Sequence, residues 1–236
     1  MSNQALGWRR WMGCALDAIL PQQCFACGAG SGGGVLCDDC RAELPGRGRA
    51  RCPVCAIEQH QGLICGVCLS AQPPFDASRA AFDYAFPTDR MVQALKYAHR
   101  LSLSRLFVEL MAEAPCPQAD LVVPMPLHPA RLRSRGFNQA AELARPLAAA
   151  WGIPLRLDGI VRDLDTHPQA ALPWKARAGN VRGAFRVRGS VEGLRVVVVD
   201  DVMTTGETLA ELARTLKAVG AASVENRIVA RTPAPG

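Results

Sequence analysis

The sequence has 236 residues, of which 49% are hydrophobic, and carries a formal net charge of +6. This length accommodates one or two domains with a hydrophobic core. No apolar run reaches the roughly 18 residues that a membrane span needs, so we predict no membrane insertion and a cytoplasmic location. Only three of the 27 basic residues are lysines. Arginine suits bidentate phosphate contacts, but the bias equally fits the base composition of a genome. The charge alone is therefore compatible with nucleic acid, a phosphorylated substrate or neither.

Residues 1–21 predict an amphipathic docking helix. A secretory signal peptide is disfavoured because Asp17 interrupts the apolar run that follows Arg9 and Arg10, and no small-residue cleavage site comes after it. Pro21 ends the helical pattern. The apolar residues at helical spacing are Trp8, Trp11, Ala15 and Ile19.

Residues 22–72 contain a repeated cysteine pattern. Eight of the ten cysteines form CxxC pairs, and the unit CxxC-x9-CxxC occurs twice without a change in spacing. Two CxxC knuckles supply the four thiolates of a tetrahedral zinc site, so we predict a double zinc ribbon with two structural Zn²⁺ ions. In the simplest pairing each repeat binds one ion, although the spacing leaves pairing across the repeats open. The eight ligands are Cys24, Cys27, Cys37, Cys40, Cys52, Cys55, Cys65 and Cys68.

Metal binding also explains how so small a module folds. Apart from cysteine it has few large apolar side chains, and ordering its backbone costs about 1–2 kcal/mol per residue. A structural zinc contributes on the order of 10–16 kcal/mol. Disulfides are disfavoured by the cytoplasmic location. An iron site would use the same ligands and is the other alternative, and we prefer zinc.

The linker between the repeats, Arg47-Gly48-Arg49-Ala50-Arg51, has two interpretations. Three arginines separated by small residues fit contacts with a nucleic-acid backbone, which makes single-stranded DNA a candidate partner. A solvated surface segment is the commoner meaning of such a run.

Pro73-Pro74 marks the start of a second domain, residues 75–236. Its first elements are a predicted strand over 79–86, a helix capped by Thr88 and a further helical stretch over 101–114.

A buried strand at 121–123 follows and ends in a turn that three prolines hold stiff and extended. The turn and the residues after it carry His128, Arg131 and Arg135. These side chains supply donors and positive charge beside a strand end, where an anion could bind. A basic surface turn is the alternative.

Gly136 to Gln139 opens the next predicted helix, which ends near Gly152 and which Pro146 is expected to bend or interrupt. A short strand is predicted near 155–157. The polar stretch over 162–180 has little periodicity, which is typical of a lid or a disordered loop.

The segment VVVVDDVMTTGETL, residues 196–209, is the centre of the predicted sheet. Four consecutive valines indicate a parallel strand that is buried on both faces, and Asp200 and Asp201 follow where such a strand would reach its carboxyl end. Ligands bind at that edge of open α/β sheets. A hydroxyl-rich loop then leads into a helix that Gly220 ends. The loop residues are Thr204, Thr205, Gly206, Glu207 and Thr208, and the helical apolar positions are Leu209, Leu212, Ala213, Leu216 and Val219.

Carboxylates next to a phosphate-binding loop are compatible if the ligand is a sugar phosphate. A helix N-terminus offers backbone N–H groups and a positive dipole end to a phosphate. Carboxylates accept hydrogen bonds from vicinal hydroxyls and hold Mg²⁺ directly or through its water. The alternative is a strand–turn–helix in which Asp200 and Asp201 only cap the helix. The intact pattern favours the sugar-phosphate interpretation, and it resembles the PRPP-binding signature of type I phosphoribosyltransferases.

Three parts of the sequence together resemble the ComF family of phosphoribosyltransferase-like proteins, which includes the gluconate-associated GntX type. They are the cysteine module, the segment VPMPLHPARLRSRGFNQ and the segment VVVVDDVMTTGETL. The resemblance covers roughly residues 24–229, and RGFNQ at 135–139 is its most distinctive element. LKY at 95–97 is similar too, as are the spaced residues Gln169, Leu172, Arg177, Asn180, Ala184 and Phe185. Pro146 departs from the pattern.

The resemblance implies an α/β fold: a type I phosphoribosyltransferase-like parallel sheet flanked by helices, preceded by the double zinc ribbon. It implies binding of PRPP with Mg²⁺ and transfer of a phosphoribosyl group at C1. In that mechanism Asp200 and Asp201 hold the ribose hydroxyls, and the loop Thr204, Thr205, Gly206, Glu207 and Thr208 holds the 5-phosphate. The candidates around the pyrophosphate are His128, Arg131, Arg135, Asn138, Gln139, Lys96 and Arg177.

The resemblance also implies a link to DNA uptake (competence) alongside a helicase-like partner, or to gluconate metabolism. Two other classes of function remain open from the sequence. One is a regulator that binds PRPP or a nucleotide without turnover. The other is a nucleic-acid or helicase adaptor that acts through the zinc ribbons.

Overall fold

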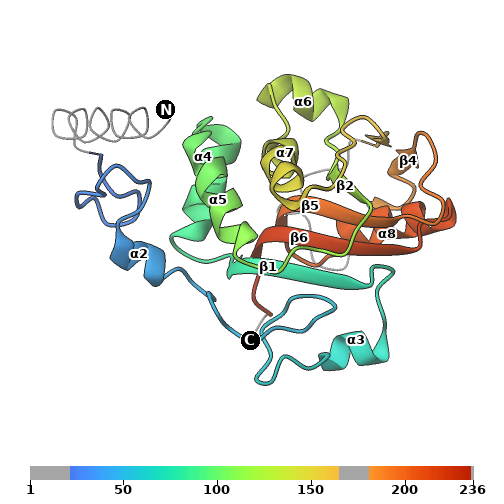
Figure 1. Ribbon diagram of the computed structural model, residues 1–236, viewed down its shortest axis with the longest axis horizontal. Helices are drawn as coiled ribbons and strands as arrows, with labels where there is room; N and C mark the ends of the chain where they lie inside the picture. Colours follow the sequence, from blue (N-terminus) through green and yellow to red (C-terminus); the bar gives the residue numbers. More distant parts are fainter. Residues whose placement is uncertain (1–21, 165–180, 235–236) are drawn as a thin grey trace, which may run out of the picture.

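A computed structural model describes residues 22–164 and 181–234 (Figure 1). The helix predicted over residues 1–21 lies outside these residues, and so do most of the predicted lid and Arg177. No helix within the described part of the chain has the length and apolar character required to cross a membrane.

The second domain is built on a four-stranded parallel sheet, which confirms the predicted fold class. Its strand order is β1-β6-β5-β2, so the last two strands of the chain occupy the centre. The bounds are β1 Ala77–Asp83, β2 Leu121–Pro124, β5 Arg195–Met203 and β6 Ser223–Arg231. The two edge strands, β1 and β2, come first in the sequence and are connected through helices. The central strands, β5 and β6, are formed by the C-terminal part of the described chain.

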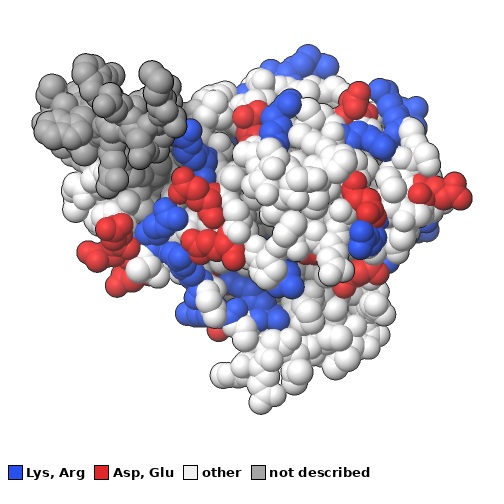
Figure 2. Space-filling view, in the orientation of Figure 1, with Lys and Arg blue, Asp and Glu red and all other residues white. Residues whose placement is uncertain are grey.

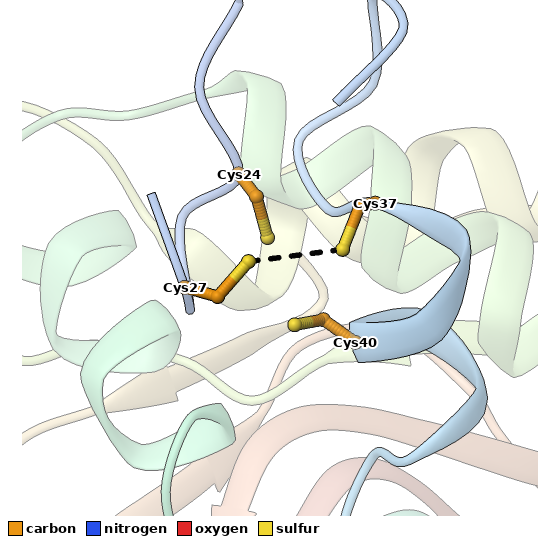
Figure 3. Close-up of side chains that lie close together, drawn as sticks. All are labelled: Cys24, Cys27, Cys37 and Cys40. Carbon is orange, nitrogen blue, oxygen red and sulfur yellow. Dashed lines mark hydrogen bonds between the residues drawn. The ribbon is translucent and has the colours of Figure 1, made fainter. Parts of the chain in front are cut away.

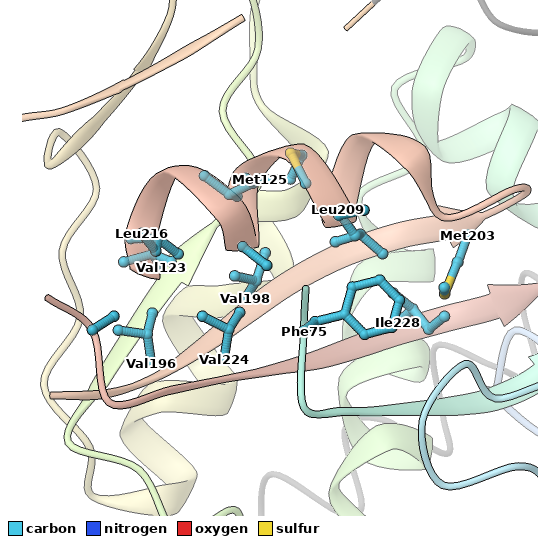
Figure 4. Packing of buried hydrophobic residues seen from close by; sticks show 14 of the residues in the cluster. Phe75, Val123, Met125, Val196, Val198, Met203, Leu209, Leu216, Val224 and Ile228 are labelled. Atoms are coloured by element: carbon cyan, nitrogen blue, oxygen red, sulfur yellow. The ribbon is translucent and has the colours of Figure 1, made fainter. Parts of the chain in front are cut away.

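The valine segment of β5 is buried on both faces, as predicted. Val197 and Val199 pack in one hydrophobic core and Val196 and Val198 in the other, because successive side chains of a strand point to opposite faces. Figure 4 shows the second of these cores, between the sheet and α8, Glu207–Ala218. The sheet is therefore the middle layer of three.

Three helices cover the face that carries Val197: α4 Thr88–Tyr97, α5 Ser102–Ala112 and α7 Gln139–Trp151. The other face is covered by α8 and by a small antiparallel pair, β3 Ile160–Arg162 and β4 Phe185–Val187. A short helix, α6 Pro129–Arg135, follows β2 (Figure 1).

Several local predictions differ from the structure. Thr88 does not cap α4: it is the first helical residue and is fully buried, and Pro87 occupies the cap position. The strand predicted near 155–157 is reduced to a single bridge between Leu155 and Val122, because the next bond after the bridge would need an N–H from Pro124 and the bond before it an N–H from Pro154.

Two predictions about helices also differ in detail. Helix α7 runs through Pro146, since a proline removes only one N–H donor and the flanking turns keep their own bonds. Val219 lies just after the end of α8 and is 47% exposed, so it is not part of the apolar helix face.

The zinc-ribbon module includes two short helices, α2 Asp38–Ala42 and α3 Gly66–Ser70. The linker between the ribbons runs along the free edge of β1, where Pro45 and Pro53 carbonyls accept from the Asp83 and Ser78 N–H groups. This contact covers an edge that would otherwise expose unpaired backbone groups.

The three linker arginines form ion pairs within the chain. Arg47 pairs with Glu113 at 3.0 Å and Arg49 with Glu58 at 2.8 Å. Figure 2 shows basic and acidic side chains intermingled beside the first ribbon. Arg51 pairs with Asp83 at 2.8 Å, and each of these side chains is only 11% exposed. Arg51 is therefore not available to a nucleic-acid phosphate, which corrects the interpretation that all three arginines contact DNA.

Replacing Arg51 with methionine is expected to lower the free energy of unfolding by about 1–3 kcal/mol, because the nearly buried Asp83 carboxylate loses its closer partner and keeps only Arg49 at 3.9 Å. Arg49→Met is the matched control: its side chain is 55% exposed, and such a surface pair contributes about 1 kcal/mol or less. Urea unfolding of the two variants measures the difference. Equal effects would mean that the Arg51–Asp83 pair does not anchor the linker.

Candidate functional site

The eight predicted zinc ligands form two separate clusters. Cys24, Cys27, Cys37 and Cys40 make one, shown in Figure 3, and Cys52, Cys55, Cys65 and Cys68 make the other. Within each cluster the ligand atoms lie within 4.8 Å of one another. The geometry thus pairs the knuckles within a repeat, which was the simplest of the predicted arrangements.

The sulfur spacing fits zinc. Four thiolates about 2.3 Å from a zinc ion at the corners of a tetrahedron would be about 3.8 Å apart. The Sγ atoms of Cys27 and Cys37 are 3.8 Å apart, and those of Cys55 and Cys65 are 3.6 Å apart. Each set of four therefore has the spacing and the donor chemistry of a structural zinc site.

The two clusters differ in how deeply they are buried. All four cysteines of the second cluster are buried, whereas Cys27 of the first is exposed and Cys37 and Cys40 are partly exposed. The second cluster packs in the same core as α8 and the sheet. We expect its zinc to contribute to the stability of the second domain as well as to that of the ribbon.

A cavity of about 400 Å³ opens where β5 ends. It lies at the carboxyl edge of the parallel sheet, where ligands bind in folds of this kind. Nine of the predicted site residues line it: Lys96, Arg131, Arg135, Gln139, Asp200, Asp201, Thr204, Gly206 and Thr208. Four others are neighbours in sequence of lining residues but do not line the cavity themselves: His128, Asn138, Thr205 and Glu207.

The acid pair lies within β5, and both carboxylates are buried. Asp200 is 8% exposed and Asp201 is 4% exposed, because β5 continues past them to Met203. Lys96 of α4 is 2.7 Å from the Asp201 carboxylate. The Oδ1 atom of Asp200 accepts a hydrogen bond from the Asp201 backbone N–H at 2.9 Å.

Burial and the neighbouring Asp201 carboxylate raise the pKa of Asp200 to about 8. Burial acts to lower the pKa of Lys96, but the nearby Asp201 and Asp200 carboxylates outweigh it, and that pKa is raised. The site therefore concentrates titrating groups whose protonation depends on one another. Such shifts are common where charge is needed for binding or chemistry.

The predicted phosphate loop turns sharply at Gly206, which has φ +88° and occupies the cap position of α8. A Cβ atom there would be 2.6 Å from the Met203 Cε atom, the flexible end of that side chain, so it is the left-handed backbone rather than the packing that favours glycine. The Thr205 hydroxyl accepts from the Glu207 N–H at 3.3 Å. Thr205 and Glu207 thus shape the loop, while Thr204 and Thr208 face the cavity.

The segment RGFNQ places arginine on the opposite wall. Gly136 ends α6 in the left-handed region, and Asn138 caps α7 while its side chain donates to the Met125 carbonyl. This arrangement brings Arg135 into the cavity, where it donates to the Gln139 side chain at 2.5 Å. His128 has a structural role here: its ring nitrogen accepts from the Ala130 N–H at the start of α6.

Comparison with known proteins gives two domain matches. Residues 15–69 match the double zinc ribbon domain, and residues 132–235 match the phosphoribosyl transferase domain. DNA utilization protein YhgH of Salmonella typhi is 38% identical over 77% of this chain and 84% of its own length. Competence protein F of Haemophilus influenzae is 30% identical over 80% of this chain and 87% of its own length. The chain belongs to the ComF family.

Solved structures similar to this ComF-family chain include a glutamine phosphoribosylpyrophosphate amidotransferase from B. subtilis. It is 28% identical, with a TM-score of 0.38, over 53% of this chain and 25% of the enzyme chain. An orotate phosphoribosyltransferase from Aeropyrum pernix is 21% identical, with a TM-score of 0.34, over 54% of this chain and 58% of that one.

Four residues with polar side chains that line the cavity of this ComF-family protein were missing from the predicted site: Tyr84, Gln93, Tyr97 and Arg162. Tyr84 directly follows β1, so its position at the carboxyl end of a strand could have identified it as a residue of the site. Gln93, Lys96 and Tyr97 share one face of α4 at helical spacing. Arg162 was not predictable from periodicity: it ends the short strand β3 and is only 7% exposed.

Proposed function

We propose that this protein binds PRPP with Mg²⁺ and transfers the phosphoribosyl group to an acceptor. The observation that carries the proposal is that one cavity unites the acid pair Asp200 and Asp201, the loop that leads into α8, and arginines on the facing wall. A sugar bearing a phosphate at one end and a pyrophosphate at the other matches that distribution of charge.

Each part of the cavity suits one part of PRPP. Thr204, Gly206 and Thr208 lie at the N-terminal end of α8, which favours the 5-phosphate. The carboxylates of Asp200 and Asp201 accept hydrogen bonds from the ribose hydroxyls.

Arginines of the opposite wall would hold the pyrophosphate. Arg131 and Arg135 line the cavity and carry guanidinium groups suited to bidentate phosphate contacts. Asp200 and Asp201 are the candidate ligands of Mg²⁺, directly or through its water, and their carboxylate oxygens are the donors that this ion prefers. When bound, Mg²⁺ would neutralise the pyrophosphate.

In the reaction the bond between C1 and the pyrophosphate oxygen breaks, and a bond forms between C1 and the acceptor nucleophile. Positive charge develops on the ribose ring and negative charge on the leaving group. The residues of the cavity therefore act by stabilising anions and excluding water rather than as a strong base. Lys96 offsets the charge of Asp201 before the ligand arrives.

Calorimetric titration tests the proposal. Mg²⁺·PRPP is expected to bind more tightly than ribose 5-phosphate or pyrophosphate, since only PRPP occupies both ends of the cavity. Release of pyrophosphate with candidate acceptors then measures turnover. Binding without release would favour a regulator that does not turn PRPP over. Absence of PRPP binding by zinc-replete protein would overturn the proposal.

The names of the relatives support a role for this chain in DNA uptake or DNA use, and we propose that its phosphoribosyl site serves such a role. Single-stranded DNA and a helicase-like protein remain the proposed partners. Of the linker arginines, Arg47 and Arg49 are the two still exposed enough to contribute to DNA binding, each at the expense of an internal ion pair.

A further inference from the structure

Arg231 is a buried cation that the proposed mechanism does not use. It is the last residue of β6 and is 5% exposed. The pyrophosphate and 5-phosphate groups of the proposed ligand are assigned to other residues, and Arg231 does not line the cavity. A buried charge requires a structural or functional explanation, because it is costly unless its N–H groups are satisfied.

The guanidinium of Arg231 donates to backbone carbonyls from three separate segments. Its Nε atom donates to the Cys55 carbonyl at 2.9 Å. Its Nη1 atom donates to the Met203 carbonyl at 3.0 Å and to the Thr232 carbonyl at 2.9 Å. The same Nη1 atom also contacts the Thr204 carbonyl.

These carbonyls join the two sites described above. Cys55 is a ligand of the second zinc cluster, and Met203 and Thr204 are the residues with which β5 ends and the phosphate loop begins. Arginine has a planar group with donors that point in several directions, so one side chain reaches both sites at once. Lysine, with a single ammonium, lacks that geometry.

Apolar packing makes a second connection between the same two sites. The cysteines of the second cluster share one core with Phe75, Met203 and Leu209, which Figure 4 shows around the end of β5. Phe75 and Met203 approach the loop closely: a Cβ atom at Gly206 would lie 3.9 Å from the Phe75 ring and 2.6 Å from Met203. The loop therefore rests on side chains that belong to the same hydrophobic core as the second zinc cluster.

The first zinc cluster lacks this connection. Cys24, Cys37 and Cys40 belong to or pack against the opposite core, with α4, α5 and α7. The chain thus contains an internal control for any effect that passes through Arg231.

We propose that Arg231 is a positioning residue that couples the second zinc site to the phosphate loop. The zinc-bound knuckle holds Arg231, and Arg231 holds Met203 and Thr204 in the conformation that receives a phosphate. By thermodynamic reciprocity, a ligand on the loop also steadies the second zinc site. The ligand half of this coupling rests on the proposed binding of PRPP, whereas the coupling between Arg231, the loop and the zinc site does not.

The test is cysteine alkylation in the presence of a chelator, with each modified cysteine quantified by mass spectrometry. Mg²⁺·PRPP is expected to slow modification of Cys52, Cys55, Cys65 and Cys68 by about fivefold or more, within the usual range of coupling between two sites. Modification of the first cluster should stay unchanged. In Arg231→Lys, which keeps the charge, the protection of the second cluster should disappear.

A second measurement needs no ligand. In zinc-loaded Arg231→Lys, amide exchange of residues 203–208 and alkylation of the second cluster should both be faster than in the wild type, while the first cluster is unaffected. Arg231→Gln repeats the measurement if the lysine variant folds poorly. Unchanged exchange of the loop, or equal acceleration at both clusters, would overturn the coupling. Failure of the wild type to bind PRPP would instead count against the proposed function alone.

Discussion

Cys68→Ser is expected to unfold the second domain together with the ribbon, whereas Cys27→Ser is expected to unfold only the first ribbon. Cys68 is 6% exposed and lies in the core that contains Phe75, Met203 and Leu209, while Cys27 is exposed. A structural zinc contributes on the order of 10–16 kcal/mol, and a domain of this kind is stable by about 5–15 kcal/mol. The free energy lost with the second zinc is therefore as large as the whole stability of the domain, so we expect the domain that shares its core to unfold.

Elemental analysis gives the first readout: two zinc ions per chain in the wild type and one in each variant. Limited proteolysis and thermal melting give the second. In Cys27→Ser a fragment that contains β1 to β6 should resist the protease, and in Cys68→Ser it should not. Cys116→Ser is the matched control, because Cys116 belongs to neither cluster. Survival of the sheet domain in Cys68→Ser would show that the two modules fold independently, as the proposed boundary at Pro73-Pro74 suggests.

The predictable parts of this structure are those in which the chemistry is local in sequence. The CxxC pairs identify both zinc sites because a knuckle places two thiolates together within four residues. The valine segment identifies β5 because a continuous run of β-branched apolar residues is typical of a parallel strand that is buried on both faces. The glycine before α8 is also determined locally, since its left-handed backbone conformation disfavours a side chain.

The unpredicted parts depend on contacts between residues that are distant in sequence. Arg51 was interpreted as either a nucleic-acid contact or a solvated surface residue, because nothing nearby in the sequence indicates its pairing with Asp83 at the end of β1. Arg231 and Cys55 are 176 positions apart. In each case a charged residue that looks exposed from composition is buried against a partner that only the fold supplies.

The acid pair was predicted in part from local sequence and depends in part on contacts with distant residues. Its sequence position correctly placed it at the carboxyl edge of the sheet, but its burial was missed. Adjacent residues of a strand point to opposite faces, so Asp201 faces the side of α4 and meets Lys96, while Asp200 continues the face of Val196 and Val198. The two acids are therefore not equivalent, and they predict different outcomes on mutation.

Asp200→Asn is expected to weaken PRPP binding and to stabilise the protein. Above pH 8, where Asp200 is ionised, the amide keeps the shape of the carboxylate but loses its charge, and charge-assisted hydrogen bonds are worth about 1.5–3 kcal/mol. The affinity for Mg²⁺·PRPP should fall about tenfold or more for each such hydrogen bond that the substitution removes.

Asp201→Asn should weaken PRPP binding similarly but lower the stability of the protein, because it leaves Lys96 without its carboxylate partner. Asp120→Asn, a change at the opposite end of β5 where Asp120 pairs with Arg195, is the control and should leave the affinity unchanged.

The pH dependence of stability separates this account from one in which the acids only cap the helix. The pKa of Asp200 is raised from 3.8 to about 8, so between these values the folded state binds more protons at this residue than the unfolded state. Stability must then fall as pH rises through this window, and the penalty is complete above pH 8. Asp200→Asn removes that penalty, and each 1 kcal/mol relieved should raise the Tm by about 2–4 °C at pH 8. At pH 4 the variant and the wild type should have the same Tm.

If the acids only capped the helix, the substitution would change the stability in the opposite direction. Losing a carboxylate cap lowers stability by about 1 kcal/mol at neutral pH and leaves PRPP binding intact. Melting curves from about pH 4 to pH 9, with calorimetry at pH 8, therefore decide between a buried ligand-binding acid and a cap.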